Sequence, residues 1–285
     1  MSDRAPMADQ QRTRLGVAGW PIVHSRSPAM HNAALAAVGL SGWRYQLLPI
    51  PPKLFTETVR GLPAAGFRGI NVTIPHKEAA LALAGSASER AAAIGAANTL
   101  LFADDGSIYA DNTDAPALIA ALSRREIELA DTSALVLGAG GSARAAVWAL
   151  ADAGVRDIRV YARTRARAER LCSELGGTVV DSVDPAQLLV HCTPVGLRAS
   201  LDVSSSEELP IPADRIKDFR TVVDFVYRDQ GSALVQAARD VAAATVDGLE
   251  LLVGQGALSF EQFTGHRAPV GVMADAAASA EAAAA

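Results

Sequence analysis

A glycine-rich stretch has the residue types and spacing that bind the pyrophosphate of a dinucleotide: Val136-Leu-Gly138-Ala-Gly140-Gly141-Ser142-Ala143. It ends an expected strand and begins an expected helix, which is the context this pattern requires. Gly138 permits a tight turn, Gly140 lets the backbone approach the phosphates, and Ala143 allows close packing of helix on strand. The free N–H groups of the helix start would face the anion. A glycine-rich turn without a ligand is the alternative.

The next expected strand ends in Val160-Tyr-Ala-Arg163-Thr164-Arg165. An NAD site would have an acidic residue here, about 20 residues after the glycines, to bind the ribose 2′-hydroxyl. Arg163 instead offers a planar set of donors that suits a 2′-phosphate, and Arg165 and Arg167 add positive charge. The pattern favours NADP. A solvated helix start is the alternative, more so for Arg165 and Arg167 than for Arg163.

Lys77 could move a proton. It follows Pro75 near the start of an expected helix over 77–84, where the positive end of the helix dipole disfavours the ammonium form. A lysine in that state can exchange a proton with a hydroxyl group. From the residues alone, an exposed helix lysine is the favoured interpretation of Lys77, as an acid in a first helical turn is of Asp114. Small polar residues gather at turn and helix-start positions in three stretches: 25–32, 71–77, and 97–99 with 112–114.

The elements that must position these residues form two βα series, so the fold class is α/β with a mostly parallel sheet in each of two lobes. We expect the first series to have strands over 15–19, 43–48 and 69–74, helices over 28–38 and 53–62, and two short strands near 99–110 around the turn at 104–106. A helix over 114–122 is the expected linker. The second series has expected strands over 134–137, 158–161, 188–192 and 221–225, and expected helices over 142–152, 165–175 and 232–239.

The segment 195–217 is an expected loop at the cleft, and a last helix is expected over 251–264. We therefore divide the chain into a discontinuous substrate domain, 12–113 with 247–273, and a Rossmann-like nucleotide domain, 114–246. Residues 1–11 and 274–285 are expected tails, the latter because it is Ala-rich without a periodic apolar face.

Composition excludes several classes of protein. The 285 residues suit about two domains, and a net charge of −5 gives no basic field for nucleic acid or an anionic membrane. Two cysteines and five histidines show no metal-ligand spacing, so no metal is expected, and the cysteine usage suits a reducing, cytoplasmic setting. No signal-like apolar segment and no run of about 18 apolar residues is present.

Over about residues 14–265 the sequence resembles the shikimate dehydrogenase family. The resemblance is carried by S-R-S-P-x-x-H-N from Ser25, N-V-T-x-P-x-K from Asn71, A-N-T, N-T-D, G-A-G-G-x-A-R-A, R-T, T-P-V-G, D-x-x-Y and G-L-x-x-L-V-x-Q. It implies an NADP-dependent, two-lobed enzyme that reduces 3-dehydroshikimate to shikimate in aromatic amino acid biosynthesis, with the active site in the cleft. A homodimer is a possible assembly.

The resemblance also implies the roles of single residues. Lys77 matches the catalytic lysine and Asp114 its acidic partner. The positions that match substrate-binding residues are Ser25, Ser27, Asn71, Thr73, Asn98, Tyr227 and Gln255. The cofactor positions are Gly138, Gly140, Gly141, Ser142, Ala143, Arg163 and Thr164. For Ser27 the alternative is a helix cap, for Asn71 and Asn98 turn-capping, and for Tyr227 ordinary core.

Four places depart from the family pattern, namely Ala115, Ala162, His191-Cys192 and Arg228-Asp229. None of them touches Lys77 or Asp114, so they bear on cofactor affinity rather than on the chemistry. Two other functions stay open: a relative that oxidises quinate or a similar acid with NAD, and a non-catalytic dinucleotide-binding sensor on the same fold.

Overall fold

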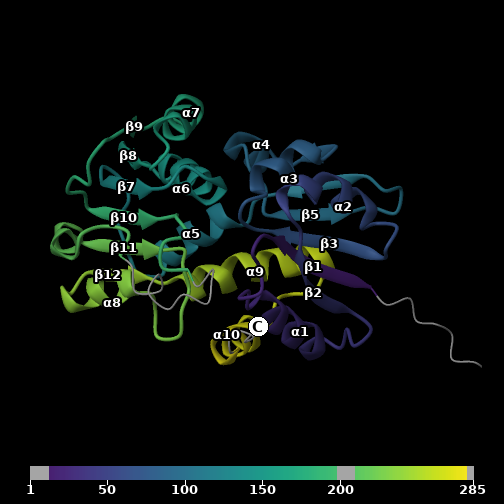
Figure 1. Cartoon of the computed structure of the whole chain (residues 1–285). Helices are drawn as coiled ribbons and strands as arrows, with labels where there is room; N and C mark the ends of the chain where they lie inside the picture. The colour runs from purple at the N-terminus through teal and green to yellow at the C-terminus, as the bar shows by residue number, and fades with distance from the viewer. Residues whose placement is uncertain (1–12, 198–208, 281–285) are drawn as a thin grey trace, which may run out of the picture.

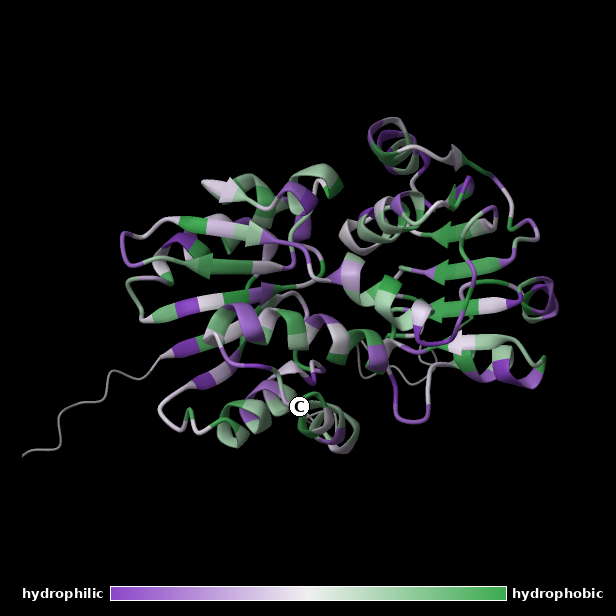
Figure 2. Cartoon of the chain, turned by 180° about the vertical axis from the view of Figure 1, so that it is seen from behind, coloured by the Kyte–Doolittle hydropathy of each residue, from purple (hydrophilic) through white to green (hydrophobic). Residues whose placement is uncertain are grey.

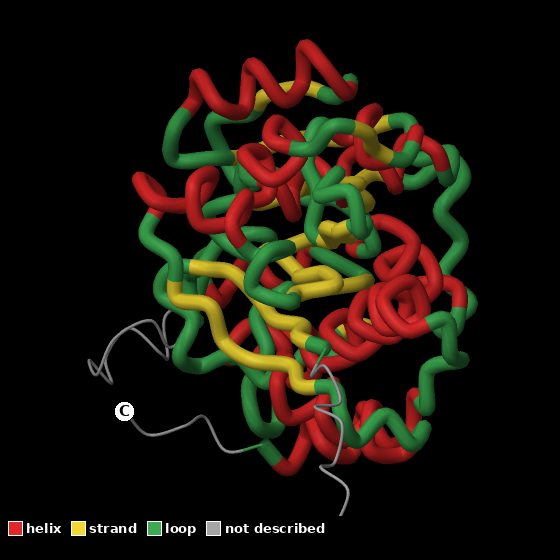
Figure 3. The backbone as a smooth tube through the Cα atoms, turned by 90° about the vertical axis from the view of Figure 1, so that its right-hand side faces the viewer, coloured by secondary structure: helices red, strands yellow, loops and turns green. Residues whose placement is uncertain are grey.

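Two α/β lobes lie side by side in the computed structural model, which describes residues 13–197 and 209–280 (Figure 1). The first sheet has the strand order β2-β1-β3-β5-β6-β4 and the second the order β12-β11-β10-β7-β8-β9. Each sheet carries helices over its faces, as the turned view in Figure 3 shows. The predicted two-lobed α/β class is confirmed. The expected tail over 1–11 lies outside the described residues.

The first lobe begins with parallel strands whose alternating helices follow the predicted order. Its elements are β1 (Arg14–Gly19), α1 (Ser27–Ala37), β2 (Arg44–Pro49), a 3-10 turn (Pro52–Leu54), α2 (Phe55–Gly61), β3 (Phe67–Val72), α3 (Lys77–Leu83), β4 (Ser86–Ala87), α4 (Glu89–Ile94), β5 (Thr99–Phe102) and β6 (Ile108–Asp111). Strand β5 pairs antiparallel with both β3 and β6, while the other pairings of this sheet are parallel. The sequence analysis missed β4 and α4.

The second lobe is a fully parallel sheet. Its elements are α5 (Asp114–Ser123), β7 (Ser133–Leu137), α6 (Gly141–Asp152), β8 (Asp157–Tyr161), α7 (Arg165–Leu175), β9 (Thr178–Val179), β10 (Leu188–His191), a 3-10 turn (Ala213–Asp218), β11 (Thr221–Asp224), α8 (Ala233–Asp240) and β12 (Ala244–Val246). Strands β10 and β11 are buried along their whole length, and β7 along all but its first residue, because helices cover both faces. Figure 2 shows these strands as mostly apolar.

The strand order of the second sheet places β7 beside β10 at its centre. The chain leaves β7 toward one edge of the sheet and leaves β10 toward the other, which opens a crevice at the carboxyl ends of the two strands. Gly138 follows β7 and Cys192 follows β10, so both lie at this crevice. The predicted loop over 195–217 borders it in part. However, residues 198–208 lie outside the described part of the chain. The last residues of the predicted loop form the 3-10 turn instead of irregular structure.

Helix α9 (Gly248–Thr264) passes beneath both lobes (Figure 1). Leu251 packs into the core of the second lobe, whereas Val253, Phe260 and Phe263 pack with the first. Helix α9 therefore returns to the first lobe. This return is why we propose the discontinuous division of the domains, with the crossings at α5 and near residue 247.

The predicted tail over 274–285 is wrong for its first part. Residues 274–279 belong to helix α10 (Val270–Ser279), in which Met273 and Ala277 are fully buried against α1. Alanine contributes little to an apolar periodicity. The two buried positions, Met273 and Ala277, were therefore too weak a pattern to predict an amphipathic helix from the sequence. The last five residues, 281–285, lie outside the described part. No helix of the described residues is long and apolar enough to cross a membrane.

His31 is a buried histidine in the core of the first lobe. Its ring stacks on Tyr45 with centroids 4.1 Å apart, and neither ring nitrogen has a hydrogen-bond partner. Burial lowers the pKa of His31 to about 3 from 6.5, because a charged ring would lose its solvation there. As the pH falls, His31 is therefore protonated at a higher pH in the unfolded chain than in the folded protein. We expect His31 to destabilise the fold progressively below about pH 6.5, by up to ~1.4 kcal/mol per pH unit.

The variant His31→Phe tests this effect, since it keeps the stacked ring and cannot titrate. Urea unfolding at pH 7.5, 6 and 5 should show that the original protein loses stability faster than the variant as the pH falls. All other groups titrate in both proteins and drop out of the difference. Parallel stability curves over this pH range would contradict the assignment.

Candidate active site

The side chains of Lys77 and Asp114 form an ion pair between the lobes. Lys77 is the first residue of α3 and Asp114 the first of α5, and their Nζ and Oδ2 atoms are 2.5 Å apart. The side chains are 11% and 7% exposed, so little water screens the pair. Lys77 Nζ also donates to the Ser142 hydroxyl oxygen at 2.8 Å. The structure thus brings the two predicted catalytic residues together.

Asp114 is held in place from several sides. The backbone N–H groups of Asp114 and Ala115 donate to Asn112 Oδ1 at 3.1 and 3.2 Å. The Asn112 side chain thereby caps the start of α5. The Asp114 Oδ1 atom accepts a hydrogen bond from Asn98 Nδ2 at 2.8 Å. One carboxylate oxygen therefore faces Asn98 and the other faces Lys77, which fixes the orientation of the carboxylate.

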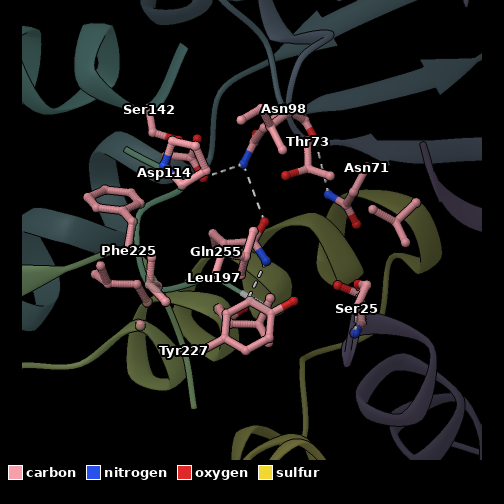
Figure 4. A pocket seen from close by; sticks show the side chains of 18 of the residues that line it. Ser25, Asn71, Thr73, Asn98, Asp114, Ser142, Leu197, Phe225, Tyr227 and Gln255 are labelled. Carbon is pink, nitrogen blue, oxygen red and sulfur yellow. Dashed lines mark hydrogen bonds between the residues drawn. The ribbon is translucent and has the colours of Figure 1, made fainter. Parts of the chain in front are cut away.

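The seven predicted substrate residues line one cavity of about 160 Å³ together with Lys77 and Asp114. Figure 4 shows Asn98 between Asp114 and Gln255, with hydrogen bonds to both. The members come from both lobes: Ser25, Ser27, Asn71, Thr73 and Asn98 from the first, Tyr227 from the segment after β11, and Gln255 from α9. The return of α9 is what brings Gln255 to this wall.

Ser25, Ser27 and Tyr227 meet at one end of the cavity. Burial raises the pKa of the Tyr227 hydroxyl, and hydrogen bonds with Ser25 and with the Arg26 backbone offset part of this shift. Ser27 is the first residue of α1, and the cap position belongs to Arg26, so the structure does not support the cap alternative for Ser27. The start of α1 and two hydroxyl side chains give this end the donors that a carboxylate needs.

Asn71 is committed to the fold as well as exposed to the cavity. Its Oδ1 atom accepts from the Tyr45 hydroxyl at 2.8 Å and from Ser259 at 3.3 Å. Its Nδ2 atom donates to the Asn98 carbonyl and the Thr99 hydroxyl, both at 3.2 Å. These four bonds fill the capacity of an amide, so a substrate hydroxyl at Asn71 has to share them.

A second cavity, of about 430 Å³, opens at the carboxyl ends of β7 and β8. The predicted cofactor residues that line it are Gly138, Gly140, Gly141, Ser142, Arg163 and Thr164. Ala143 does not line it and is buried between α6 and the sheet, which agrees with a packing role. Gly138 has φ +111°, a conformation that favours glycine. A Cβ at Gly140 would meet no atom within 4 Å, so this backbone is open to the cavity.

The two cavities share a border made of Lys77, Ser142, Cys192 and Thr193 among others. From the sequence, no site role was expected for Cys192, which departs from the family pattern. Burial raises the pKa of its thiol far above the ordinary value, so the group stays neutral. Its position follows from β10 lying beside β7, which no local sequence signal gives.

The arginines after β8 have different surroundings. Arg163 is exposed and lines the cofactor cavity. Arg165 pairs with Glu169 and Asp181 and does not line it. Arg167 lines the cavity and also pairs with Glu78 of the first lobe, 3.0 Å away. The alternative in which these arginines only form a solvated helix start therefore fits Arg165 best.

Two departures from the family pattern have structural partners. His191 is buried, with Nδ1 2.8 Å from Asp224 Oδ1 and Nε2 2.6 Å from the Thr193 hydroxyl, so it ties β10 to β11 below the crevice. Arg228 Nε donates to the Gly196 carbonyl at 3.0 Å and so reaches the loop at the cleft. Among the described residues no group of three or more His, Cys, Asp or Glu side chains could hold a metal ion.

Comparisons with known proteins agree with this geometry. Three family models match the chain: the shikimate dehydrogenase substrate binding domain over residues 17–100, shikimate / quinate 5-dehydrogenase over 120–193, and the shikimate 5'-dehydrogenase C-terminal domain over 248–278. A shikimate dehydrogenase (NADP(+)) of Methylobacterium radiotolerans is 45% identical over 270 residues, 89% of this chain and 92% of the relative. The chain belongs to the shikimate dehydrogenase family.

Other members of the shikimate dehydrogenase family are similar over the same extent. The enzyme of Paracoccus denitrificans is 40% identical over 259 residues, covering 90% of this chain and 92% of that one. The structure of the Thermus thermophilus enzyme in complex with NADP(H) and shikimate superposes with a TM-score of 0.80 at 38% identity, covering 93% and 98% of the two chains. That of the Aquifex aeolicus enzyme gives 0.83 at 33% identity, covering 95% and 99%.

Proposed function

We propose that this protein catalyses the reversible, NADPH-dependent reduction of 3-dehydroshikimate to shikimate. The observation that carries the proposal is the Lys77–Asp114 pair, in which Lys77 lies at the border between the cavity lined by the predicted substrate residues and the cavity lined by the glycine-rich turn. Relatives named shikimate dehydrogenase (NADP(+)) and a neighbour that binds NADP(H) and shikimate support it.

The residues of the second cavity suit NADP. The open backbone at Gly140 and the start of α6 face the same space, which suits a pyrophosphate. Arg163 and Thr164 lie at the end of β8, where the ribose of a dinucleotide lies in this fold. Their charge and hydroxyl group suit a 2′-phosphate. When bound, the nicotinamide of NADP supplies or accepts the hydride.

Lys77 moves the proton at the substrate oxygen in this proposal. In the direction of reduction its ammonium group donates a proton to the carbonyl oxygen as the hydride arrives at the carbon, and in oxidation the amine takes the hydroxyl proton back. Asp114 keeps the lysine in position by its charge-assisted hydrogen bond. Asn98 holds the other oxygen of Asp114, so the acid cannot turn away from Lys77.

The remaining polar residues orient the substrate. Ser25 and Ser27, at the start of α1, suit its carboxylate, and Tyr227 closes that end from the second lobe. Thr73 and Gln255 line the cavity with a hydroxyl and an amide that suit ring hydroxyl groups. The Asn98 amide already bonds Thr113, Asp114 and Gln255, so a substrate hydroxyl at Asn98 has to share those bonds. A substrate fixed at both ends presents one oxygen to Lys77.

An absorbance assay of the reduced nicotinamide tests the function, with shikimate or quinate as substrate and NADP or NAD as cofactor. With shikimate as substrate, we expect kcat/KM for NADP to exceed that for NAD by at least about 10-fold, because a site built for a phosphate group loses a charge-assisted contact with NAD. Preference for quinate or NAD would favour the alternative of a relative that oxidises quinate or a similar acid with NAD. Turnover in no pairing would favour the sensor.

The setting of the enzyme is also part of the proposal. We propose that it acts in the cytoplasm, because both cysteines, Cys172 and Cys192, are free thiols. A net charge of −5 argues against nucleic acid as a partner. Its partners are then the small substrate and the cofactor.

A further inference from the structure

Ser142 belongs to the cofactor-binding turn by sequence, yet its hydroxyl oxygen accepts a hydrogen bond from the Lys77 ammonium at 2.8 Å. Ser142 lines both cavities and lies in the first turn of α6, in the lobe opposite to Lys77. An ammonium has three N–H donors. Asp114 and Ser142 take two of them among the described residues, which leaves the third for a substrate oxygen.

The backbone beside Ser142 packs directly on the stem of the lysine. A Cβ at Gly141 would lie 2.5 Å from Lys77 Cβ, so only glycine permits this approach. The contact therefore involves the aliphatic part of Lys77 as well as its charge. Because Ser142 binds the ammonium group and Gly141 packs against the aliphatic stem, few rotamers are open to the Lys77 side chain.

Arg144 holds the first turn of α6 against the first lobe at a second point. This arginine is buried, and its Nε donates to the carbonyl of Ile94 at the end of α4 at 2.7 Å. A Cβ at Gly95 would lie 2.3 Å from Arg144 Nη2, so the guanidinium sits directly on the backbone there. Ser142 and Arg144 thus fix the start of α6 relative to α3 and α4, respectively.

We propose that Ser142 is a positioning residue for proton transfer: it holds the Lys77 ammonium from the nucleotide lobe so that its remaining donor points at the substrate oxygen. This inference rests on the proposed function. It links the helix that receives the cofactor pyrophosphate to the group that moves the proton. Ser142 and Asp114 each accept one N–H bond of Lys77 Nζ, so the two partners together limit the directions left to the third N–H bond.

The variants Ser142→Ala and Ser142→Thr test the proposal, with Ser173→Ala on the outer helix α7 as a control for removing a serine hydroxyl. We expect Ser142→Ala to lower kcat about 10-fold with KM for shikimate and Kd for NADP changed less than about 2-fold. Ser142→Thr should restore most of kcat because it returns the hydroxyl. A change confined to the binding of NADP, or an unchanged kcat, would overturn the proposal.

A second measurement does not depend on turnover. The chain has only three lysines, Lys53, Lys77 and Lys217, and the other two are exposed. Competitive acetylation with acetic anhydride, read by mass spectrometry, compares Lys77 with both internal standards. Loss of the acceptor at Ser142 weakens the hold on the ammonium, so the relative reactivity of Lys77 should rise about 3-fold at pH 8 in Ser142→Ala. Equal labelling ratios in the original protein and the variant would overturn the contact itself, whether or not the protein oxidises shikimate.

Discussion

Replacement of Lys77 by alanine lowers kcat for shikimate oxidation about 10²- to 10⁴-fold, with KM changed by no more than a few-fold. The expected loss is large because the amine is the group that exchanges a proton with the substrate oxygen. Asp114 then stays behind as a carboxylate only 7% exposed without its cation, so part of the loss comes from a disturbed site. Steady-state kinetics with saturating NADP measure the change.

Lys53→Ala is the matched control, since Lys53 is an exposed lysine in the 3-10 turn before α2 and lines neither cavity. It should leave kcat and KM as they are. Binding of NADP to Lys77→Ala, followed by fluorescence, should stay within a few-fold and shows that the second lobe is intact. Retention of more than about a tenth of kcat in Lys77→Ala would contradict its role in proton transfer.

Replacement of Arg163 by alanine raises KM for NADP about 10- to 100-fold and leaves kinetics with NAD almost unchanged. The reason is that Arg163 is an exposed cation at the cavity wall where a 2′-phosphate would lie, whereas Arg167 on the same wall pairs with Glu78. A charge-assisted contact of this kind contributes about 1.5–3 kcal/mol. The ratio of kcat/KM for NADP to that for NAD is the quantity to measure, because it isolates the phosphate.

Arg165→Ala provides the comparison for this second variant. Arg165 is two residues away but pairs with Glu169 and Asp181 and does not line the cavity. The same removal of positive charge there should change the ratio less than about 2-fold. If both variants lowered the ratio equally, a general positive field at the helix start would explain cofactor preference better than a contact with Arg163.

Much of the fold could be predicted from the sequence because strands and long helices carry strong apolar patterns. The helix at Arg165–Leu175 and the strand ending at Leu137 were predicted within one residue. Short elements were missed: β12 has three residues and β4 two, too few for any periodicity. Helix α10 was missed because alanine hardly differs between a buried and an exposed helix face.

The candidate site was predictable where one stretch of sequence carries several of its residues. Asn71 lies at the end of β3, Thr73 directly after it and Lys77 at the start of α3, and all three line one cavity. The contact of Ser142 with Lys77 was not predicted, because residues 65 positions apart meet only through the way the lobes are set against each other. The same holds for Cys192, whose place depends on the strand order.

Because α9 and α10 complete the core of the first lobe, that lobe cannot be completed during synthesis until after the second lobe has been made. Leu15, Val17, Met30 and Leu35 precede the whole second lobe in the chain, yet the side chains that cover them include Phe260, Phe263 and Met273, which follow that lobe. At ~5–20 residues per second, the nascent first sheet waits on the order of ten seconds or more for this cover. The second lobe, with its own continuous sheet, is finished earlier. The lobe begun first is therefore finished last, and its apolar face is the surface a chaperone would meet during synthesis.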